Sequence, residues 1–262
     1  MSTLSYVMRD SATMLRRDVK HSVRFPMMTL SGLGTPIIML ALFNYFYGGT
    51  IGAGLGGVAH GGPYINYLAP AIIIMTVASG CASTAVTFVT DMNEGIIARF
   101  RTMAIARASV LTGTVLGSLI RTMLTIGLVI GVALLMGFRP TADPASWLAA
   151  LGLIALFTLA VTWMGVVFGL VGKSPAGANS LSLIFLLLVF TSSGFVDTAS
   201  MPAGVRWFAE YQPVTPVINT LRGLLLGTPI GNSAVLAIAW SVGLSLVGYL
   251  WARAMYNRDP VR

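Results

Sequence analysis

Six apolar segments alternate with polar connections along the chain. They cover residues 26–47, 67–90, 110–138, 147–171, 179–195 and 233–255. An apolar run of about 18 residues or more predicts a helix that crosses a bilayer. The fifth segment has 17 residues, near the lower limit for crossing. The pattern predicts an all-α polytopic membrane protein with six transmembrane helices.

The first 25 residues have a different pattern. Apolar positions repeat at helical spacing on one side of a helical wheel, and five basic residues gather nearly opposite: Arg9, Arg16, Arg17, Lys20 and Arg24. This arrangement predicts an amphipathic helix along the membrane surface. Alternatively, these basic residues only set the orientation of the chain. The sequence therefore divides into an amphipathic helix at residues 1–25 and a transmembrane domain at residues 26–262.

Composition limits the classes of function. Hydrophobic residues make up 56% of the 262 residues and charged residues 9%, with a mean hydropathy of +0.83. A soluble domain of this length needs far more charge on its surface. The net charge is +8, but the basic residues lie at the ends of apolar segments and form no single patch. A nucleic-acid partner is therefore not expected.

The distribution of Lys and Arg predicts the orientation in the membrane. Twelve of these residues precede the first segment, lie in the second and fourth connections, or lie in the last residues of the chain from Arg253 onward. Only three lie in the alternate connections: Arg139, Arg206 and Arg222. Because Lys and Arg are enriched on the cytoplasmic side, both termini and the second connection are expected in the cytoplasm.

Arg121 is the one clear charge inside a predicted span. A charge near the bilayer centre is costly, so Arg121 is expected to face other helices or water. One interpretation is functional: Arg121 anchors the helix bundle or lines a transport path. The other is that its long side chain simply extends toward the cytoplasmic face. Both interpretations stay open at this point.

Residues for catalysis or for binding a nucleotide or metal are lacking. The six segments contain no Asp or Glu, which argues against an intramembrane enzyme and a proton-driven carrier. His21 and His60 are expected on opposite sides of the membrane, so they cannot share a metal. The tripeptide Gly172-Lys173-Ser174 lacks the earlier glycine of a phosphate-binding loop, because Val167 occupies that position.

The second connection is a polar insert, Asp91–Arg107, with five charges in a chain that has few. Its apolar residues Ile96, Ile97 and Phe100 recur at helical spacing, and Glu94 lies on another face. One interpretation is an interfacial helix that rests on lipid. An anionic leaflet disfavours acidic residues, however, whereas a protein groove accommodates both signs of charge. The insert is therefore interpreted as a docking element for a cytoplasmic partner.

The segment 194–227 precedes the last span and is too broken by proline for a spanning helix. It contains Pro202, Pro213 and Pro216, yet also the aromatic pair Trp207 and Phe208. Irregular backbone at membrane depth is tolerated only where protein or water satisfies it. The segment is predicted to form short helices that re-enter the outer leaflet, with a plain surface loop as the alternative.

Two long stretches resemble one family. The stretch Asp91-Met-Asn-Glu-Gly-Ile-Ile-Ala-Arg-Phe-Arg101, continuing to Gly113, closely resembles the signature of ABC-2-type transporter permeases, particularly their daunorubicin-resistance branch. A second stretch, from Ser193 through Pro213 and Pro216 to Leu221-Arg-Gly-Leu-Leu-Leu-Gly227, resembles the same family. The two motifs occur in the expected order, and the resemblance covers nearly the whole chain.

The resemblance implies a non-catalytic permease subunit in a bacterial plasma membrane, usually a homodimer. It implies two copies of a separate ATPase subunit that bind ATP and Mg, and a cargo that is an amphipathic drug, antibiotic or lipid. The insert would be the coupling helix seated on the ATPase, with these coupling positions: Asp91, Glu94, Gly95, Ile96, Ile97, Arg99, Phe100 and Arg101. The outer gate and re-entrant segment would include Phe195, Trp207, Phe208, Pro213 and Pro216.

Two other functions remain open. The first is an ABC permease for a cell-envelope glycan or glycolipid, and the second is a channel or carrier that needs no ATPase. The missing intramembrane carboxylates lower the expectation of a carrier. The residues alone do not define the cargo or the residues that bind it.

Overall fold

The computed structural model describes residues 26–47, 64–94, 107–196 and 198–258. Within these ranges there are eight α-helices and no strand. The helices are α2 (Pro26–Leu42), α4 (Tyr64–Asn93), α6 (Arg107–Leu135), α7 (Pro144–Gly172), α8 (Pro175–Phe190), α9 (Ala203–Tyr211), α10 (Val214–Leu226) and α11 (Ser233–Arg258). A π-helical turn, Phe43–Tyr47, continues α2, and a 3-10 turn, Thr198–Ser200, precedes α9. The all-α prediction is confirmed for these ranges, whereas the helix predicted at residues 1–25 lies outside them.

Four of the described helices are long and apolar enough to cross a membrane: α4, α6, α7 and α11. They contain most of the predicted segments 67–90, 110–138, 147–171 and 233–255. The first predicted segment has the same bounds as α2 together with its π-helical turn. The protein is therefore a multi-pass membrane protein.

The fifth segment was predicted too far toward the C-terminus, since α8 covers Pro175–Phe190 and not 179–195. The helix begins earlier because the Ser174 hydroxyl accepts a hydrogen bond from the N–H of Gly177 at 3.1 Å, and Pro175 suits the first helical position. It ends earlier where the Thr191 hydroxyl donates to the carbonyl of Leu187 at 2.9 Å. Such hydroxyl bonds compete with helix continuation.

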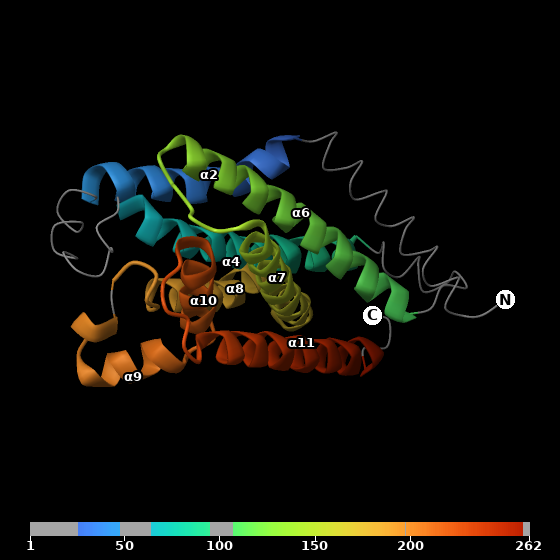
Figure 1. The fold of residues 1–262 in the computed structure, drawn as a ribbon. Coiled ribbons are helices and arrows are strands. Elements are labelled where there is room, and N and C mark those ends of the chain that lie inside the picture. Colours follow the sequence, from blue (N-terminus) through green and yellow to red (C-terminus); the bar gives the residue numbers. More distant parts are fainter. Residues whose placement is uncertain (1–25, 48–63, 95–106, 197, 259–262) are drawn as a thin grey trace.

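Helix α4 lies at the centre of the bundle and contacts α2, α6, α7, α8 and α10 (Figure 1). Glycines on α7 allow this close packing. A Cβ at Gly165 would lie 2.9 Å from the carbonyl oxygen of Cys81, and one at Gly169 would lie 2.9 Å from that of Ala85. Small residues at this spacing let helix backbones approach closely in membranes.

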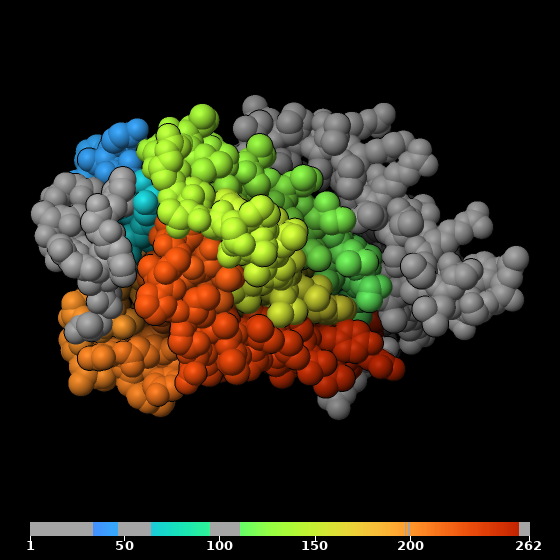
Figure 2. All heavy atoms as spheres, in the orientation of Figure 1, coloured from blue at the N-terminus to red at the C-terminus, as the bar shows by residue number. Residues whose placement is uncertain are grey.

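Helix α11 packs on α7 and α10 along one narrow stripe. The buried positions of this stripe carry mostly small residues: Ala237, Ser241, Gly248, Ala252 and Tyr256. The opposite face carries large apolar side chains that are exposed, among them Leu246 and Leu250. The spheres of α11 form the lower edge of the visible face in Figure 2.

Three parts of the chain meet at one end of the bundle, which we call the α10 end. The backbone N–H of Arg139, after α6, donates to Asn66 Oδ1 in the first turn of α4 at 3.0 Å. The N–H of Thr141 donates to the carbonyl of Leu225 at the end of α10, at 2.9 Å. The start of α4, the α6–α7 connection and α10 are therefore neighbours.

The ends of α2 and α8 reach the same place. The hydroxyl of Tyr67 donates to the carbonyl of Ser193, just after α8, at 2.8 Å. The ring of Phe195 lies 4.9 Å from that of Phe43 in the turn that continues α2. Helix α11 starts beside α10 and runs to the other end, where α4 ends and α6 begins (Figure 1). The helices α2, α4, α6, α7, α8 and α11 therefore alternate in direction.

Candidate functional site

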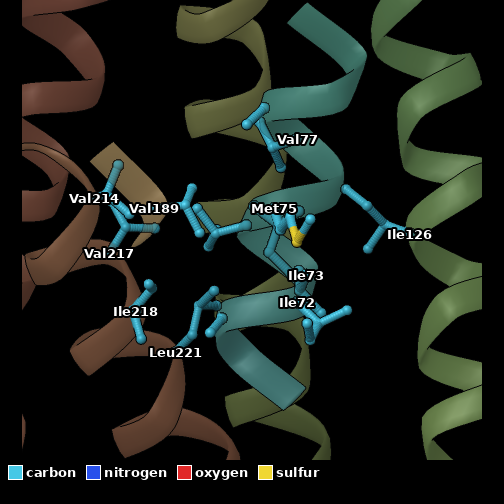
Figure 3. Packing of buried hydrophobic residues seen from close by; sticks show 14 of the residues in the cluster. Ile72, Ile73, Met75, Val77, Ile126, Val189, Val214, Val217, Ile218 and Leu221 are labelled. Atoms are coloured by element: carbon cyan, nitrogen blue, oxygen red, sulfur yellow. The ribbon is translucent and has the colours of Figure 1, made fainter. Parts of the chain in front are cut away.

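Helix α10 carries one apolar face, and this face lies on the first half of α4. Val217, Ile218 and Leu221 are fully buried and point toward Ile72 and Ile73 of α4 (Figure 3). The positions follow the spacing of one helix face. This packing brings the last two turns of α10 to the start of α4, where polar groups collect.

Arg222 is the centre of this polar cluster. Its Nη2 donates to the carbonyl of Tyr67 and to the carbonyl of Ser193, each at 3.2 Å. Its Nη1 donates to Asn219 Oδ1 at 3.3 Å. The guanidinium carbon also lies 3.8 Å from the centre of the Tyr67 ring, which is a cation–π contact. One side chain thereby joins α10, α4 and the linker after α8.

The linker itself is held by side chains of α10. The hydroxyl of Ser193 donates to Asn219 Oδ1 at 2.8 Å, and the N–H of Ser193 donates to the Thr215 hydroxyl at 3.2 Å. The Gln212 amide nitrogen donates to the same hydroxyl at 3.5 Å. We call Tyr67, Ser193, Asn219 and Arg222, together with Thr215, the Arg222 cluster. Because buried polar groups are stable only when they are paired, this network fixes the path of the linker.

Proline and glycine residues give α10 its position. Pro213 immediately precedes the helix, and Pro216 lies in its first turn, where a missing N–H costs little. Gly227 ends the helix with φ of 73°, a conformation that favours glycine. Gly194 permits close approach of the linker, since a Cβ there would lie 2.8 Å from the Cβ of Ala71 on α4.

The residues predicted for the outer gate fall into two groups. Phe195, Pro213 and Pro216 lie in the linker or at the start of α10, and Phe195 is buried between the rings of Phe43 and Phe190. Trp207 and Phe208 lie on α9, 68% and 46% exposed. The structure therefore does not bring all five residues together.

The two predicted coupling residues that the structure describes, Asp91 and Glu94, lie at the opposite end of the bundle. Asp91 is half-buried in the last turn of α4, and Glu94 follows this helix with an exposed side chain. The N–H of Glu94 donates to the carbonyl of Thr90 at 2.9 Å, so the helical path continues to this residue. The other coupling positions lie outside the described residues: Gly95, Ile96, Ile97, Arg99, Phe100 and Arg101.

Arg121 lies in the middle of α6 and is half-buried. Its Nη2 donates to the Ser118 hydroxyl at 3.4 Å, so the side chain points back toward the start of α6. That is the direction in which a long side chain would extend toward the predicted cytoplasmic side. The Arg222 cluster does not include it.

Sequence reasoning counted the charge of Arg222 and included the residue in the second family motif, but it predicted no contact for its side chain. One signal was present: Arg222 follows apolar residues at the spacing of a helix face, so α10 carries a cation beside its buried face. Tyr67 gave no signal, since an aromatic residue at the start of a span is expected at any membrane interface.

Comparisons with known proteins identify the family. A family model described as "ABC-2 type transporter" matches residues 10–226. The daunorubicin resistance ABC transporter permease protein DrrB1 of Streptomyces coeruleorubidus is 26% identical over 235 residues, which are 89% of this chain and 78% of the relative. The probable doxorubicin resistance ABC transporter permease protein DrrC of Mycobacterium tuberculosis is 26% identical over 180 residues, which are 67% of this chain and 65% of the relative.

A more distant relative is ABC transporter G family member 20 of Dictyostelium discoideum. It is 24% identical over 169 residues, which are 62% of this chain but only 22% of that much longer protein. These relatives share the family that the two sequence motifs resemble. The chain belongs to the ABC-2 type transporter family.

Proposed function

We propose that this chain is the permease subunit of an ATP-driven exporter that moves an amphipathic drug, antibiotic or lipid out of the cell. The energy comes from a separate ATPase subunit, which binds ATP and Mg. Two copies of the chain and two copies of the ATPase form the working complex. The bacterial relatives are drug-resistance permeases by name, and the likeness covers most of both chains for the first of them.

One observation carries this proposal: the described residues of the two family motifs lie at opposite ends of the bundle. Asp91 and Glu94 lie where α4 ends, and α6 begins after the insert at the same end. Ser193 and Arg222 lie at the α10 end. An exporter needs this separation, because one end receives the movement of the ATPase and the other end opens to release cargo.

The proposed orientation places the α4–α6 insert and both termini in the cytoplasm. The twelve Lys and Arg residues counted above support it. Helices α2 and α8 complete the set of six spans, since they run between the same two ends as the four long helices. Helices α9 and α10 then form the re-entrant segment on the outer side.

The proposed mechanism is alternating access. ATP binding closes the two ATPase subunits, the insert moves with them, and the paired permeases open outward. Shifting a two-state gate from 1:99 to 99:1 requires about 5.5 kcal/mol of differential interaction. A rigid protein contact that continues directly into α4 can transmit such a change, because α4 contacts most of the other helices.

Reconstitution tests the proposal. The chain and its ATPase would be placed together in liposomes, with daunorubicin and a fluorescent phospholipid as probes. We expect movement of a probe that requires ATP, Mg and both subunits. Activity of the chain alone that is indifferent to ATP would contradict the proposal and support a channel or carrier.

A charge-reversal variant tests the coupling positions. Glu94→Arg combined with Arg101→Glu is expected to weaken ATPase binding and ATP-dependent export. The matched control is Arg206→Glu with Glu210→Arg, which reverses an exposed ion pair of 2.8 Å on α9, at the other end. Normal ATPase binding and export in the first variant would remove Glu94 and Arg101 from the coupling site.

A further inference from the structure

We propose that Arg222 is a latch that holds α10 and the linker after α8 against α4 in the closed state. Release of its guanidinium is then the local event that lets the α10 end open. The role in transport rests on the proposed function, but the latch itself can be tested on the chain alone. Arg222 acts by positioning these segments.

The geometry supports a latch because one guanidinium holds two segments that are far apart in sequence. Its Nη2 bonds to a carbonyl in the first turn of α4 and to a carbonyl of the linker. Separation of α10 from α4 breaks the Tyr67 contacts, and separation of α10 from the linker breaks the Ser193 contact. No movement of α10 away from both segments preserves these bonds.

In a membrane, these polar contacts are the main factor that keeps α10 docked on α4. Lipid tails are as apolar as the side chains that line α10, so burial of Val217, Ile218 and Leu221 gives no large preference for protein over lipid. Directional bonds decide whether such a helix stays docked. Arginine suits this role because its planar fork presents several donors and also stacks on an aromatic ring.

The same contacts can be released. The named acceptors are carbonyl and amide oxygens without net charge, so each bond is weaker than a buried ion pair. When α10 moves, water or lipid headgroups at the membrane surface can replace these acceptors. The cluster therefore favours the closed state without locking it permanently.

The test measures access to the α10–α4 interface in purified chain in detergent. Cys81 would be replaced by alanine, and one cysteine introduced at Val217, which is fully buried on α10 and faces α4 (Figure 3). The rate of labelling by a maleimide reports opening of this interface. A second protein carries its cysteine at Val166, which is equally buried in a different cluster beside α11.

The key variant is Arg222→Gln, and its matched control is Arg206→Gln, an exposed arginine on α9. We expect Arg222→Gln to raise labelling at position 217 by about tenfold or more, which corresponds to about 1.4 kcal/mol of lost closed-state preference. Labelling at position 166 should not change. Arg206→Gln should leave both rates unchanged, although it removes the same charge.

Two results would overturn the latch. One is a folded Arg222→Gln protein that labels at position 217 at the original rate. The other is an equal increase at positions 217 and 166, which would mean general loosening. If Arg222→Gln does not fold, Arg222→Lys takes its place, since lysine keeps the charge but lacks the planar fork. Unchanged labelling at position 217 in Arg222→Lys would then contradict the proposal.

Transport assays separate the latch from the proposed function. In the complex with the ATPase, loss of the latch should lower the cargo moved per ATP hydrolysed while ATP turnover persists. If Arg222→Gln raises labelling but the original chain with its ATPase exports neither probe, the latch is supported and the exporter is contradicted. If Arg222→Gln leaves labelling unchanged but the original chain with its ATPase exports normally, only the latch is contradicted.

Discussion

Helices α4 and α11 are nearly equal in length and apolarity but have opposite surroundings. Their most apolar windows have mean hydropathies of 1.9 and 1.8, yet 67% of the α4 window is buried and only 17% of the α11 window. Helix α4 is enclosed by five other helices, whereas α11 contacts α7 and α10 along one stripe. Hydropathy predicts that both cross the membrane, but it does not distinguish a central helix from a peripheral one.

The difference follows from the solvent. In water, a large apolar side chain is driven to the interior, so apolarity predicts burial. In a bilayer the surroundings are as apolar as the interior, and close packing and polar bonds determine which faces meet. The buried stripe of α11 accordingly carries mostly small residues, whereas most of its large apolar side chains are exposed.

The largest expected effect comes from truncating one large side chain on each helix. Ile72 of α4 is fully buried, and Leu250 of α11 is 59% exposed. Ile72→Ala should lower the free energy of unfolding by about 2–5 kcal/mol, because it leaves a cavity. Leu250→Ala should change it little. Thermal unfolding in a mild detergent measures both, and equal losses would mean that the two helices do not differ in this way.

A smaller loss is expected from adding a methyl group between α7 and α4. In Gly165→Ala the new Cβ meets the carbonyl oxygen of Cys81 at 2.9 Å, and backbone must move to admit it. We expect a loss of about 1–3 kcal/mol. The control is Gly127→Ala on α6, where no atom lies within 4 Å of the new Cβ among the described residues. If the control loses as much stability, the absence of a side chain at Gly165 has no special role in the packing of α7 on α4.

The periphery can be tested through the bond that attaches α9 to α11. The indole N–H of Trp240 donates to the carbonyl of Tyr211 at 3.1 Å. Trp240→Phe removes this donor, with an expected cost of about 0.5–1.5 kcal/mol. Trypsin should then cut faster after Arg206 on α9. Trp251→Phe, at a similarly exposed tryptophan of α11, is the control, and equal rates in both variants would rule out the attachment.

The smallest effect concerns α7, the helix that contacts both α4 and α11. Asp143 precedes α7, and hydrogen bonds from the hydroxyl and backbone N–H of Ser146 lower the pKa of its carboxyl group. The folded-state pKa lies below the unfolded value, so the stabilisation is present above the unfolded pKa and is lost as the pH falls through the folded pKa.

Asp143→Ala should therefore lower the melting temperature at neutral pH by about 2–4 °C, as expected for a lost helix cap in a protein of this size. Asp143→Asn keeps a capping oxygen but does not titrate. The difference between the original chain and Asp143→Asn should change as the pH falls through the acidic range. A pH-independent difference would show that the carboxylate does not stabilise α7.

The sequence predicted some features better than others. The limits of α11 and of α2 with its π-helical turn follow hydropathy closely, because these helices end where the chain turns polar or glycine-rich. The limits of α8 were wrong, because Ser174 and Thr191 act through hydroxyl bonds that an apolarity count does not include. For the candidate site, the prolines of segment 194–227 drew attention to the part of the chain that contains α10 and the linker, but Arg222 and Tyr67 were missed as the centre of the polar cluster.

What the sequence determined by itself was the class of protein, the number of apolar segments and the family, because these depend on composition and on order along the chain. The tertiary structure alone decided which of two equally apolar helices is central. It also decided that a tyrosine and an arginine 155 residues apart in sequence lie in contact. Hydropathy is a property of single residues, whereas packing in a bilayer depends on pairs of surfaces that fit and bond to each other, and these pairs exist only in the folded chain.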